Sequence, residues 1–422
     1  MQPNDPGISS ETLALTKVSV RFPRPQIADI EQTVRKEMTQ CQQLFAREAT
    51  IAVAVGSRGV ANLSLIVGVA IAFLKERGTK PFIVPAMGSH GGATADGQRQ
   101  LLADYGVTEE NMGCPIRASM EVVELDHGDL PHRLFMDRLA FGSDGVLLIN
   151  RIKSHTDFHG SYESGLVKMA VIGLGKERQA LEVHRFGACG LRDFIPRAAE
   201  KILATGKVLA GLGVVENAYD ETAVIEAVPA CELLTREPQL LDVARRNMAR
   251  LPVDAIDVLI VDRLGKNISG TGMDTNVIGR LRISGEPEPE SPRIKNIVVT
   301  DLTGETHGNA TGTGLADVVT QRLFDKIDFG VTYKNVFTSG FLERGKVPIV
   351  SATDAEGYTC ALRACGPVAR GEERVARIRD TLHLGEIYLS PALCAEVRDR
   401  ADVKAVSGPV EMFNAMGDLN PF

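Results

Sequence analysis

Short apolar runs that end in glycine-rich turns recur through the first part of the chain. Residues 51–55 form one such run, and a Gly-Ser-Arg-Gly turn follows at residues 56–59. Residues 81–85 form a second run, which leads into Gly-Ser-His-Gly-Gly at residues 88–92. Residues 145–149 form a third. Runs of this length, bounded by glycine, are typical of buried strands.

Helical patterns separate these predicted strands. Residues 63–77 and 95–105 carry apolar side chains at helical spacing, and Asn62 and Thr94 stand where N-caps are expected. Residues 27–45 predict an amphipathic helix before the first strand. Alternation of strand, glycine turn and helix favours a parallel sheet with helices on both faces, and ligands bind at the carboxyl ends of such strands.

The chain of 422 residues is too long for a single compact core, so we expect two domains. Apolar strands at residues 257–261 and 297–300, with a helix at residues 315–324, indicate a second α/β unit. We place the boundary between residues 1–251 and residues 252–422. The predicted fold is α/β, with two α/β domains, mainly parallel sheets and an active-site cleft between them.

Composition narrows the classes of function. A net charge of -7 and a pI near 5.7 give no basic field, which argues against nucleic-acid or anionic-membrane partners and favours a small ligand. The seven cysteines include no CxxC pair, so neither a disulfide framework nor a zinc knuckle is expected. The amino terminus lacks a signal-peptide pattern, and the longest apolar run, residues 65–74, is too short for a membrane span. We therefore expect a cytoplasmic protein.

The segment at residues 150–187 has the composition of an active site. It holds three of the eight histidines, together with lysines and glycines, directly after a predicted strand. Imidazole is a common proton shuttle near neutral pH and a common metal ligand, and a buried lysine can be a covalent nucleophile. Lys168 lies among the apolar residues 165–172, which predicts a buried stem, whereas Lys176 and Lys266 would ordinarily be solvated.

Other motifs in the chain are weaker. The glycine-rich fragments at residues 173–177 and 270–272 complete neither GxxxxGK[ST] nor GxGxxG, so a nucleoside triphosphatase or a common dehydrogenase gains little support. His155 and His159 stand four residues apart, but the glycine that follows makes a helix there doubtful. One surface and one buried histidine explain the spacing equally well.

Taken in order, these residues match a known family. The chain resembles the nickel-pincer-nucleotide-dependent lactate racemases, the 2-hydroxyacid racemase and epimerase superfamily, over about residues 49–348. The resemblance is carried by the turn with Ser57 and Arg58, by Gly88-Ser-His90, Lys153-Ser-His155 and Gly165-Leu-Val-Lys168, by His184, and by Lys266.

The resemblance implies roles for these positions. The cofactor would be a nickel-pincer nucleotide, and the enzyme would racemise or epimerise a small 2-hydroxy acid by hydride transfer to and from it, through a bound 2-keto acid. Cofactor biosynthesis proteins would load the chain. The implied roles are cofactor attachment for Lys168, cofactor binding for Ser57 and Arg58, nickel ligation for His184, acid/base catalysis for His90 and His155, and substrate binding for Arg263 and Lys266.

The chain also departs from the family pattern. Asp262 and Arg263 stand where the family has a tyrosine and a glutamine, and there is no tryptophan to form a substrate wall. We therefore expect a larger or more oxygen-rich acid than lactate. The 13-residue spacing from His155 to Lys168 leaves His159 as a rival second base. The alternative function is a zinc hydrolase that uses His155, His159 and His184, or a catalytically silent ligand-binding protein on the same fold.

Overall fold

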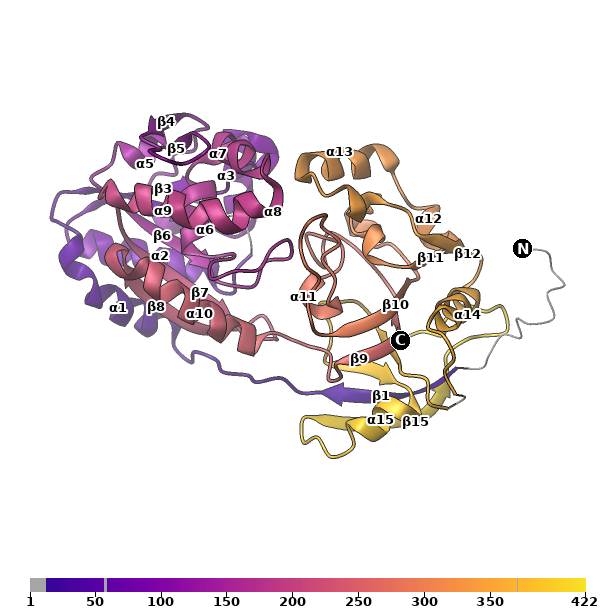
Figure 1. The fold of residues 1–422 in the computed structure, drawn as a ribbon. Helices are drawn as coiled ribbons and strands as arrows, with labels where there is room; N and C mark the ends of the chain where they lie inside the picture. Colours follow the sequence, from indigo (N-terminus) through magenta and orange to yellow (C-terminus); the bar gives the residue numbers. More distant parts are fainter. Residues whose placement is uncertain (1–12, 57–58, 370) are drawn as a thin grey trace. The chain divides into compact units, whose positions relative to one another are not determined.

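A computed structural model describes residues 13–56, 59–369 and 371–422 of the chain. The chain forms two compact units: an N-terminal unit of Pro23–Met248, and a C-terminal unit of Ala249–Phe422 together with Met1–Phe22 (Figure 1). The division after Met248 falls three residues before the predicted boundary. The assignment of the first residues was wrong, because strand β1 (Ala14–Val20) pairs with two strands of the C-terminal unit.

A five-stranded sheet, in the order β3-β2-β6-β7-β8, forms the centre of the N-terminal unit. Its first four strands are parallel, and β8 closes the sheet antiparallel to β7. A separate hairpin joins β4 and β5. The strands are β2 (Thr50–Val55), β3 (Lys80–Pro85), β4 (Val122–Leu125), β5 (Leu134–Asp137), β6 (Gly145–Arg151), β7 (Val208–Glu216) and β8 (Thr222–Pro229).

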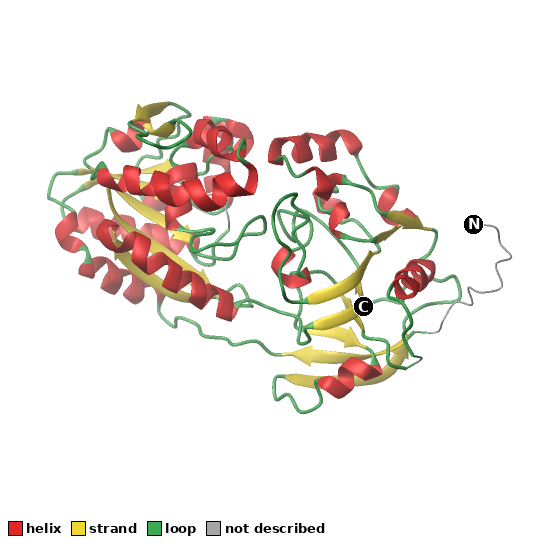
Figure 2. Ribbon diagram, in the orientation of Figure 1, coloured by secondary structure: helices red, strands yellow, loops and turns green. Residues whose placement is uncertain are grey.

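Helices cover both faces of this sheet (Figure 2). The α-helices described in this unit are α1 (Ile30–Gln40), α2 (Leu63–Glu76), α3 (Ala95–Asp104), α4 (Glu109–Met112), α5 (Arg138–Phe141), α6 (Leu166–Lys168), α7 (Lys176–His184), α8 (Gly187–Cys189), α9 (Ile195–Ala204) and α10 (Leu233–Asn247). Two π-helical turns, Met169–Gly173 and Gly190–Phe194, follow α6 and α8.

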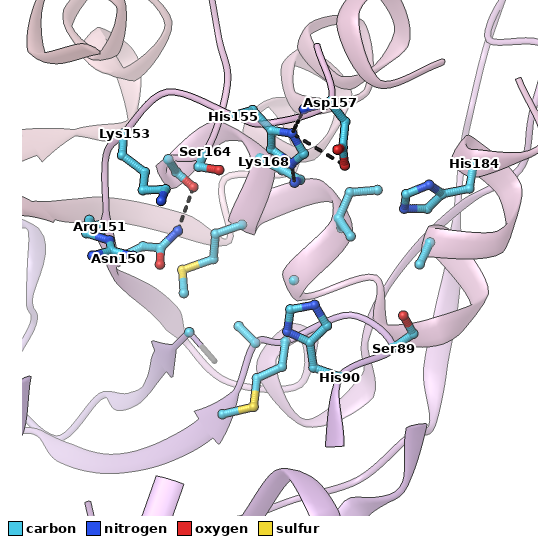
Figure 3. A pocket seen from close by; sticks show the side chains of 18 residues that line it. Ser89, His90, Asn150, Arg151, Lys153, His155, Asp157, Ser164, Lys168 and His184 are labelled. Atoms are coloured by element: carbon cyan, nitrogen blue, oxygen red, sulfur yellow. Dashed lines mark hydrogen bonds and ion pairs between the residues drawn. The ribbon is translucent and has the colours of Figure 1, made fainter. Parts of the chain in front are cut away.

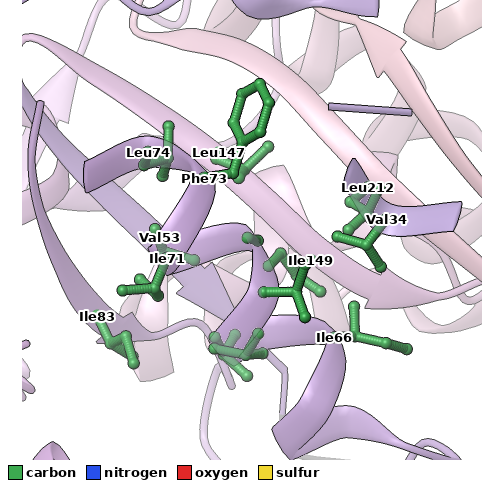
Figure 4. Packing of buried hydrophobic residues seen from close by; sticks show 14 of the residues in the cluster. Val34, Val53, Ile66, Ile71, Phe73, Leu74, Ile83, Leu147, Ile149 and Leu212 are labelled. Atoms are coloured by element: carbon green, nitrogen blue, oxygen red, sulfur yellow. The ribbon is translucent and has the colours of Figure 1, made fainter. Parts of the chain in front are cut away.

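The core of the N-terminal unit explains why its strands are continuously apolar. Val53 and Ile149 of the sheet pack with Val34 of α1 and Ile66 of α2 on one face (Figure 4). On the other face, the side chain of Leu166 in α6 lies against the backbone of β7. Both faces are therefore buried, and each large apolar side chain contributes about 1.5–3 kcal/mol to folding.

The C-terminal unit contains an eight-stranded sheet in the order β12-β11-β10-β9-β13-β14-β1-β15. The first five strands run parallel, and the last three are antiparallel to their neighbours. Its remaining elements are β9 (Ala255–Val261), α11 (Thr275–Ile278), β10 (Arg293–Val299), β11 (Val318–Thr320), α12 (Gln321–Phe324), α13 (Phe329–Ser339), β12 (Ile349–Ser351), α14 (Asp354–Ala364), β13 (Val375–Ile378), β14 (Glu386–Leu389), α15 (Pro391–Glu396) and β15 (Val403–Glu411).

The predicted fold class is confirmed: the chain forms two α/β units whose sheets are mainly parallel. The predicted helix at residues 315–324 was wrong, because the β-branched Val318–Thr320 pairs with β10 as a buried strand and the α-helix is limited to Gln321–Phe324. Thr94 caps α3 as expected, whereas Asn62 makes no capping hydrogen bond and donates to Thr222 instead. Within the described residues, no helix has the length and apolar character to cross a membrane.

Candidate active site

A pocket of about 200 Å³ opens in the N-terminal unit at the carboxyl ends of β2, β3 and β6 (Figure 3). This is the edge at which parallel sheets place their ligands. All of its lining residues belong to this unit. The side chains that can do chemistry there are Ser89 and His90 after β3; Arg151, Lys153, His155 and Asp157 at the end of β6 and in the loop that follows; Lys168 of α6; and His184 of α7.

The loop after β6 is organised by the buried carboxylate of Glu163. It accepts hydrogen bonds from the backbone N–H groups of His155 at 2.5 Å and Gly160 at 3.3 Å. The guanidinium of Arg245 on α10 donates at 2.7 Å, and the Nδ1 atom of His159 lies at 3.2 Å. Burial alone would raise the pKa of Glu163, but these contacts outweigh it and hold the pKa below its usual value. The charged carboxylate of Glu163 therefore holds the backbone of His155 in place by accepting its N–H group.

His155 is buried and makes contacts through both ring nitrogens. Its Nδ1 atom accepts the backbone N–H of Asp157 at 3.0 Å, and its Nε2 atom lies 2.5 Å from the Nζ atom of Lys168. The carboxylate of Asp157 lies farther from Nδ1, at 3.7 Å. Because Nδ1 acts as an acceptor, the proton of a neutral imidazole is on Nε2, facing Lys168.

Lys168 stands on a short helix whose amino end is held by Glu237 of α10. The Oε2 atom of Glu237 accepts the N–H of Val167 at 2.8 Å, and burial raises the pKa of this carboxyl group to about 7. A Cβ atom at Gly165 would lie 2.3 Å from Glu237, so only glycine fits there. The π-helical turn Met169–Gly173 follows directly, and such turns are frequent at functional sites.

His184 closes the pocket from the last residue of α7. Burial lowers the pKa of its imidazole, a positive charge at Lys168 would lower it further, and Asp157 opposes the shift. The side chain is therefore neutral at physiological pH. A neutral imidazole has a free lone pair, which is the state that binds a metal ion.

His90 lies on the turn after β3 and is exposed to the pocket. The side-chain amide of Gln98 holds this turn, because it donates to the carbonyl oxygens of Gly88 at 2.9 Å and His90 at 3.2 Å. Gly91 has a φ of +66°, and a Cβ atom there would lie 2.7 Å from the backbone nitrogen of Gln98. The turn thus requires glycine in order to present His90.

The expectation that Lys176 is solvated was wrong. Lys176 is fully buried, where it pairs with Asp137 at 3.0 Å and donates to the carbonyl of Pro85. Burial lowers its pKa, and the pairing with Asp137 opposes this. Lys176 therefore fastens the end of β3 to the start of α7. Lys168, in contrast, is only partly buried and its amine lines the pocket.

The remaining predicted residues lie elsewhere. Ser57 and Arg58 are outside the described residues. Arg263 and Lys266 belong to the loop after β9 in the C-terminal unit. The Nε atom of Arg263 lies 3.1 Å from a carboxylate oxygen of Asp380, and Lys266 donates to the carbonyl of Gly270 at 2.5 Å.

The proposed zinc triad does not assemble in the pocket. His155 and His184 line it, but His159 does not, and its Nδ1 atom contacts Glu163 instead. Throughout the described parts of the chain, no group of three or more His, Cys, Asp or Glu side chains is arranged to hold a metal ion. A metal at His184 would thus need most of its donors from another group.

The sequence analysis missed Glu163 and Glu237, which shape the pocket from behind it. Their signal in the sequence is faint. Glu163 stands four residues after His159, and Glu237 lies in a helix more than sixty residues from the turn that it holds. Only the packing of α10 against α6 reveals the second.

Comparison with known proteins finds a likeness among solved structures. No family model matches the chain, and no curated protein matches it. Among solved structures, the lactate racemase apoprotein from Thermoanaerobacterium thermosaccharolyticum is similar, with 14% identity and a TM-score of 0.49 over 93% of this chain and 97% of that one. At this identity and TM-score, the likeness assigns no function.

Proposed function

We propose that the chain is a nickel-dependent racemase or epimerase of a 2-hydroxy acid, and that the N-terminal pocket holds a nickel-pincer nucleotide. One observation carries this proposal: His90, His155, Lys168 and His184, which come from two strand exits and two helices, line one pocket. Two imidazoles, a reactive amine and a neutral metal-binding imidazole are the groups that this chemistry requires.

The residues of the pocket fit such a cofactor. The amine of Lys168 would attach it, and the neutral His184 would bind its nickel. Because the protein offers so few metal donors here, the sulfur and carbon donors of the pincer would complete the coordination, and nickel accepts soft ligands together with imidazole. When bound, the cofactor would supply an acceptor for the hydride of C2.

The two remaining histidines would move the hydroxyl proton. In Figure 3, His90 lies across the pocket from His155 and Lys168. Inversion at one carbon needs a proton donor or acceptor on each side, so this arrangement supports acid/base roles for both. The fixed Nδ1 contact of His155 leaves Nε2 as the atom that would exchange the proton.

Cations would orient the carboxylate of the acid. Lys153 lines the pocket, and Arg151 is paired with Glu216 beside it. Arg263 and Lys266 remain proposed substrate-binding residues, and Ser57 and Arg58 remain proposed cofactor-binding residues. A charge-assisted contact of this kind fixes the substrate for reaction on either face.

The test uses protein produced together with cofactor biosynthesis proteins. Chirality change and deuterium incorporation at C2 would be followed across a panel of 2-hydroxy acids that includes lactate, dicarboxylates and sugar acids. We expect turnover that depends on nickel loading and is better for the larger acids. Loaded protein that inverts none of them contradicts the proposal, and loss of activity in His159→Ala with full activity in His155→Ala would move the second base to His159.

A further inference from the structure

Lys176 is buried where α7 meets β3, β5 and α3, and its backbone is in an unusual conformation. It is the first residue of α7, and its φ of +57° lies in the left-handed region, which residues with a side chain rarely adopt. Its side chain is completely buried. A strained backbone and a buried lysine are both costly, so they persist where the surrounding contacts require them. The contacts of this side chain therefore indicate its role.

The side-chain amine of Lys176 has polar neighbours from three different elements. It lies 3.0 Å from a carboxylate oxygen of Asp137 in β5, donates to the carbonyl of Pro85 in β3, and donates to the Oε1 atom of Gln98 in α3 at 3.4 Å. Asp137 is itself held in place, because its other oxygen accepts the N–H of Ala140 at 2.8 Å. The ion pair thus ties the hairpin of β4 and β5 to the end of β3.

Gln98 extends this contact to the turn that bears His90. Gln98 is completely buried, and its Nε2 atom donates to the carbonyl oxygens of Gly88 at 2.9 Å and His90 at 3.2 Å. A side-chain amide has one oxygen that accepts and one NH₂ group that can donate twice. Because the oxygen of Gln98 faces the amine of Lys176, its NH₂ group is directed at the turn. Lys176 therefore sets the orientation of the amide that holds the turn.

We propose that Lys176 is a positioning residue for His90, and that it acts through Gln98 and through the end of β3. Its buried pair with Asp137 anchors the turn after β3 to the rest of the N-terminal unit, so that the imidazole of His90 stays in the pocket. Lys176 does not line the pocket itself, so it acts on the reaction only through these neighbours. The catalytic role of His90 rests on the proposed function, whereas the position of the turn does not.

A purely structural role for Lys176 is the competing explanation. In that case its loss lowers the stability of the unit and the yield of loaded protein, but turnover per bound nickel is unchanged. A positioning role lowers turnover per bound nickel, because a displacement of about 1 Å at an acid/base group can cost about 100-fold in rate. Hydrogen exchange at the turn and kcat per bound nickel therefore separate the two roles.

The first experiment follows hydrogen exchange in apoprotein by mass spectrometry. Gln98→Met removes the hydrogen bonds to the turn without creating a buried charge. Asp137→Asn combined with Lys176→Met, the pair variant, removes both charges and so leaves no unpaired carboxylate. In each, the amides of residues 88–93 should exchange about tenfold faster than in wild type, while β6 keeps its protection. Lys207→Met, which removes a lysine contact with the carbonyl of Ser143 directly before β7, should exchange at the turn like wild type.

The second experiment uses enzyme loaded by cofactor biosynthesis proteins. Gln98→Met and the pair variant should each lower kcat per bound nickel about 10- to 100-fold, with KM and nickel content near wild type. Combining all three substitutions should lower kcat no further than the pair variant alone, because Lys176 acts through Gln98. Unchanged exchange at the turn or unchanged kcat per bound nickel would overturn the proposal, as would effects on kcat that multiply. If wild type racemises no acid, the proposed function fails, and the exchange measurement alone decides whether Lys176 holds the turn.

Discussion

The segments that follow β6 and β9 contain similar residue types, but their side chains have different partners. After β9, Asp262 forms two hydrogen bonds with the guanidinium of Arg377, both at 2.8 Å, and Arg263 pairs with Asp380. After β6, the amine of Lys168 and the imidazole of His155 line a pocket. After β9, the carboxylate of Asp380 holds Arg263, whereas the amine of Lys168 lies against the imidazole of His155 in the pocket.

The difference teaches that residue type at a strand exit does not by itself mark a reactive group. Arg377 is almost fully buried, and burial raises the pKa of Asp262 against the lowering effect of its partner. Such a pair is a structural device whose charges satisfy each other. In a reactive site, by contrast, the neighbouring groups leave the lone pair of the nucleophile available for bonding.

The strongest prediction concerns the bases of the N-terminal pocket. Replacing His90 or His155 by alanine should lower the racemisation rate by roughly 10²- to 10⁴-fold, because each removes a proton donor or acceptor. Cofactor and nickel content should stay near wild type, as measured by intact mass and metal analysis. Full activity in either variant would remove that histidine from the reaction.

The second prediction tests the structural role of the pair after β9. Arg377→Met leaves the partly buried Asp262 carboxylate without its partner, so the free energy of unfolding should fall by about 3 kcal/mol. Urea unfolding followed by circular dichroism measures the loss, and hydrogen exchange with mass spectrometry should locate it in the C-terminal unit. A loss of less than 1 kcal/mol would show that the pair is dispensable.

The third prediction uses the carboxyl group behind Lys168. The pKa of Glu237 is raised from 4.5 to about 7 in the folded protein, so the folded state keeps a proton that the unfolded chain loses as pH rises through this window. This contribution to stability is complete below pH 4.5 and is lost by pH 8, a change of about 3 kcal/mol. Glu237→Gln does not titrate, so the free energy of unfolding of wild type minus that of the variant should fall from pH 5 to pH 8. A gap independent of pH would contradict the raised pKa.

The smallest effect is expected for the exposed cation of the C-terminal unit. Arg263→Ala should change turnover by less than about tenfold and stability by about 1 kcal/mol or less, because Arg263 is partly solvated in its ion pair. Steady-state kinetics on the loaded enzyme would measure the change. A loss of turnover as large as that of His90→Ala would show that the segment after β9 matters as much for the reaction as the N-terminal pocket.

Local patterns predicted much of the fold. The strands β2, β3 and β6 and the helices α2 and α3 follow from apolar runs, glycine turns and the Thr94 cap, all of which act within a few residues. The positions of β1 and β15 in the sheet could not be predicted from the sequence, because their pairing joins residues about 390 apart, and no local signal specifies such a partner. The strand Val318–Thr320 was hidden in a predicted helix, because its partners in β10 also lie outside the local window.

The candidate site divides in the same way. The pocket contains His90, His155, Lys168 and His184, which the sequence singled out through its glycine-rich turns and through the family resemblance. The residues that hold these side chains in place could not be predicted. Glu237 and Arg245 come from α10, which packs against the site from far along the chain. The burial of Lys176 depends on Asp137 and Pro85, so its neighbours in sequence gave the wrong expectation.

The most direct test of the account is the intact mass of protein loaded by cofactor biosynthesis proteins. Wild type should carry an addition of nucleotide size, mapped to the peptide that contains Lys168. Lys168→Ala should carry none, and Lys80→Ala, which changes an exposed lysine, should match wild type. An unmodified wild type, or an addition that persists in Lys168→Ala, would contradict the claim that this pocket binds the cofactor through Lys168.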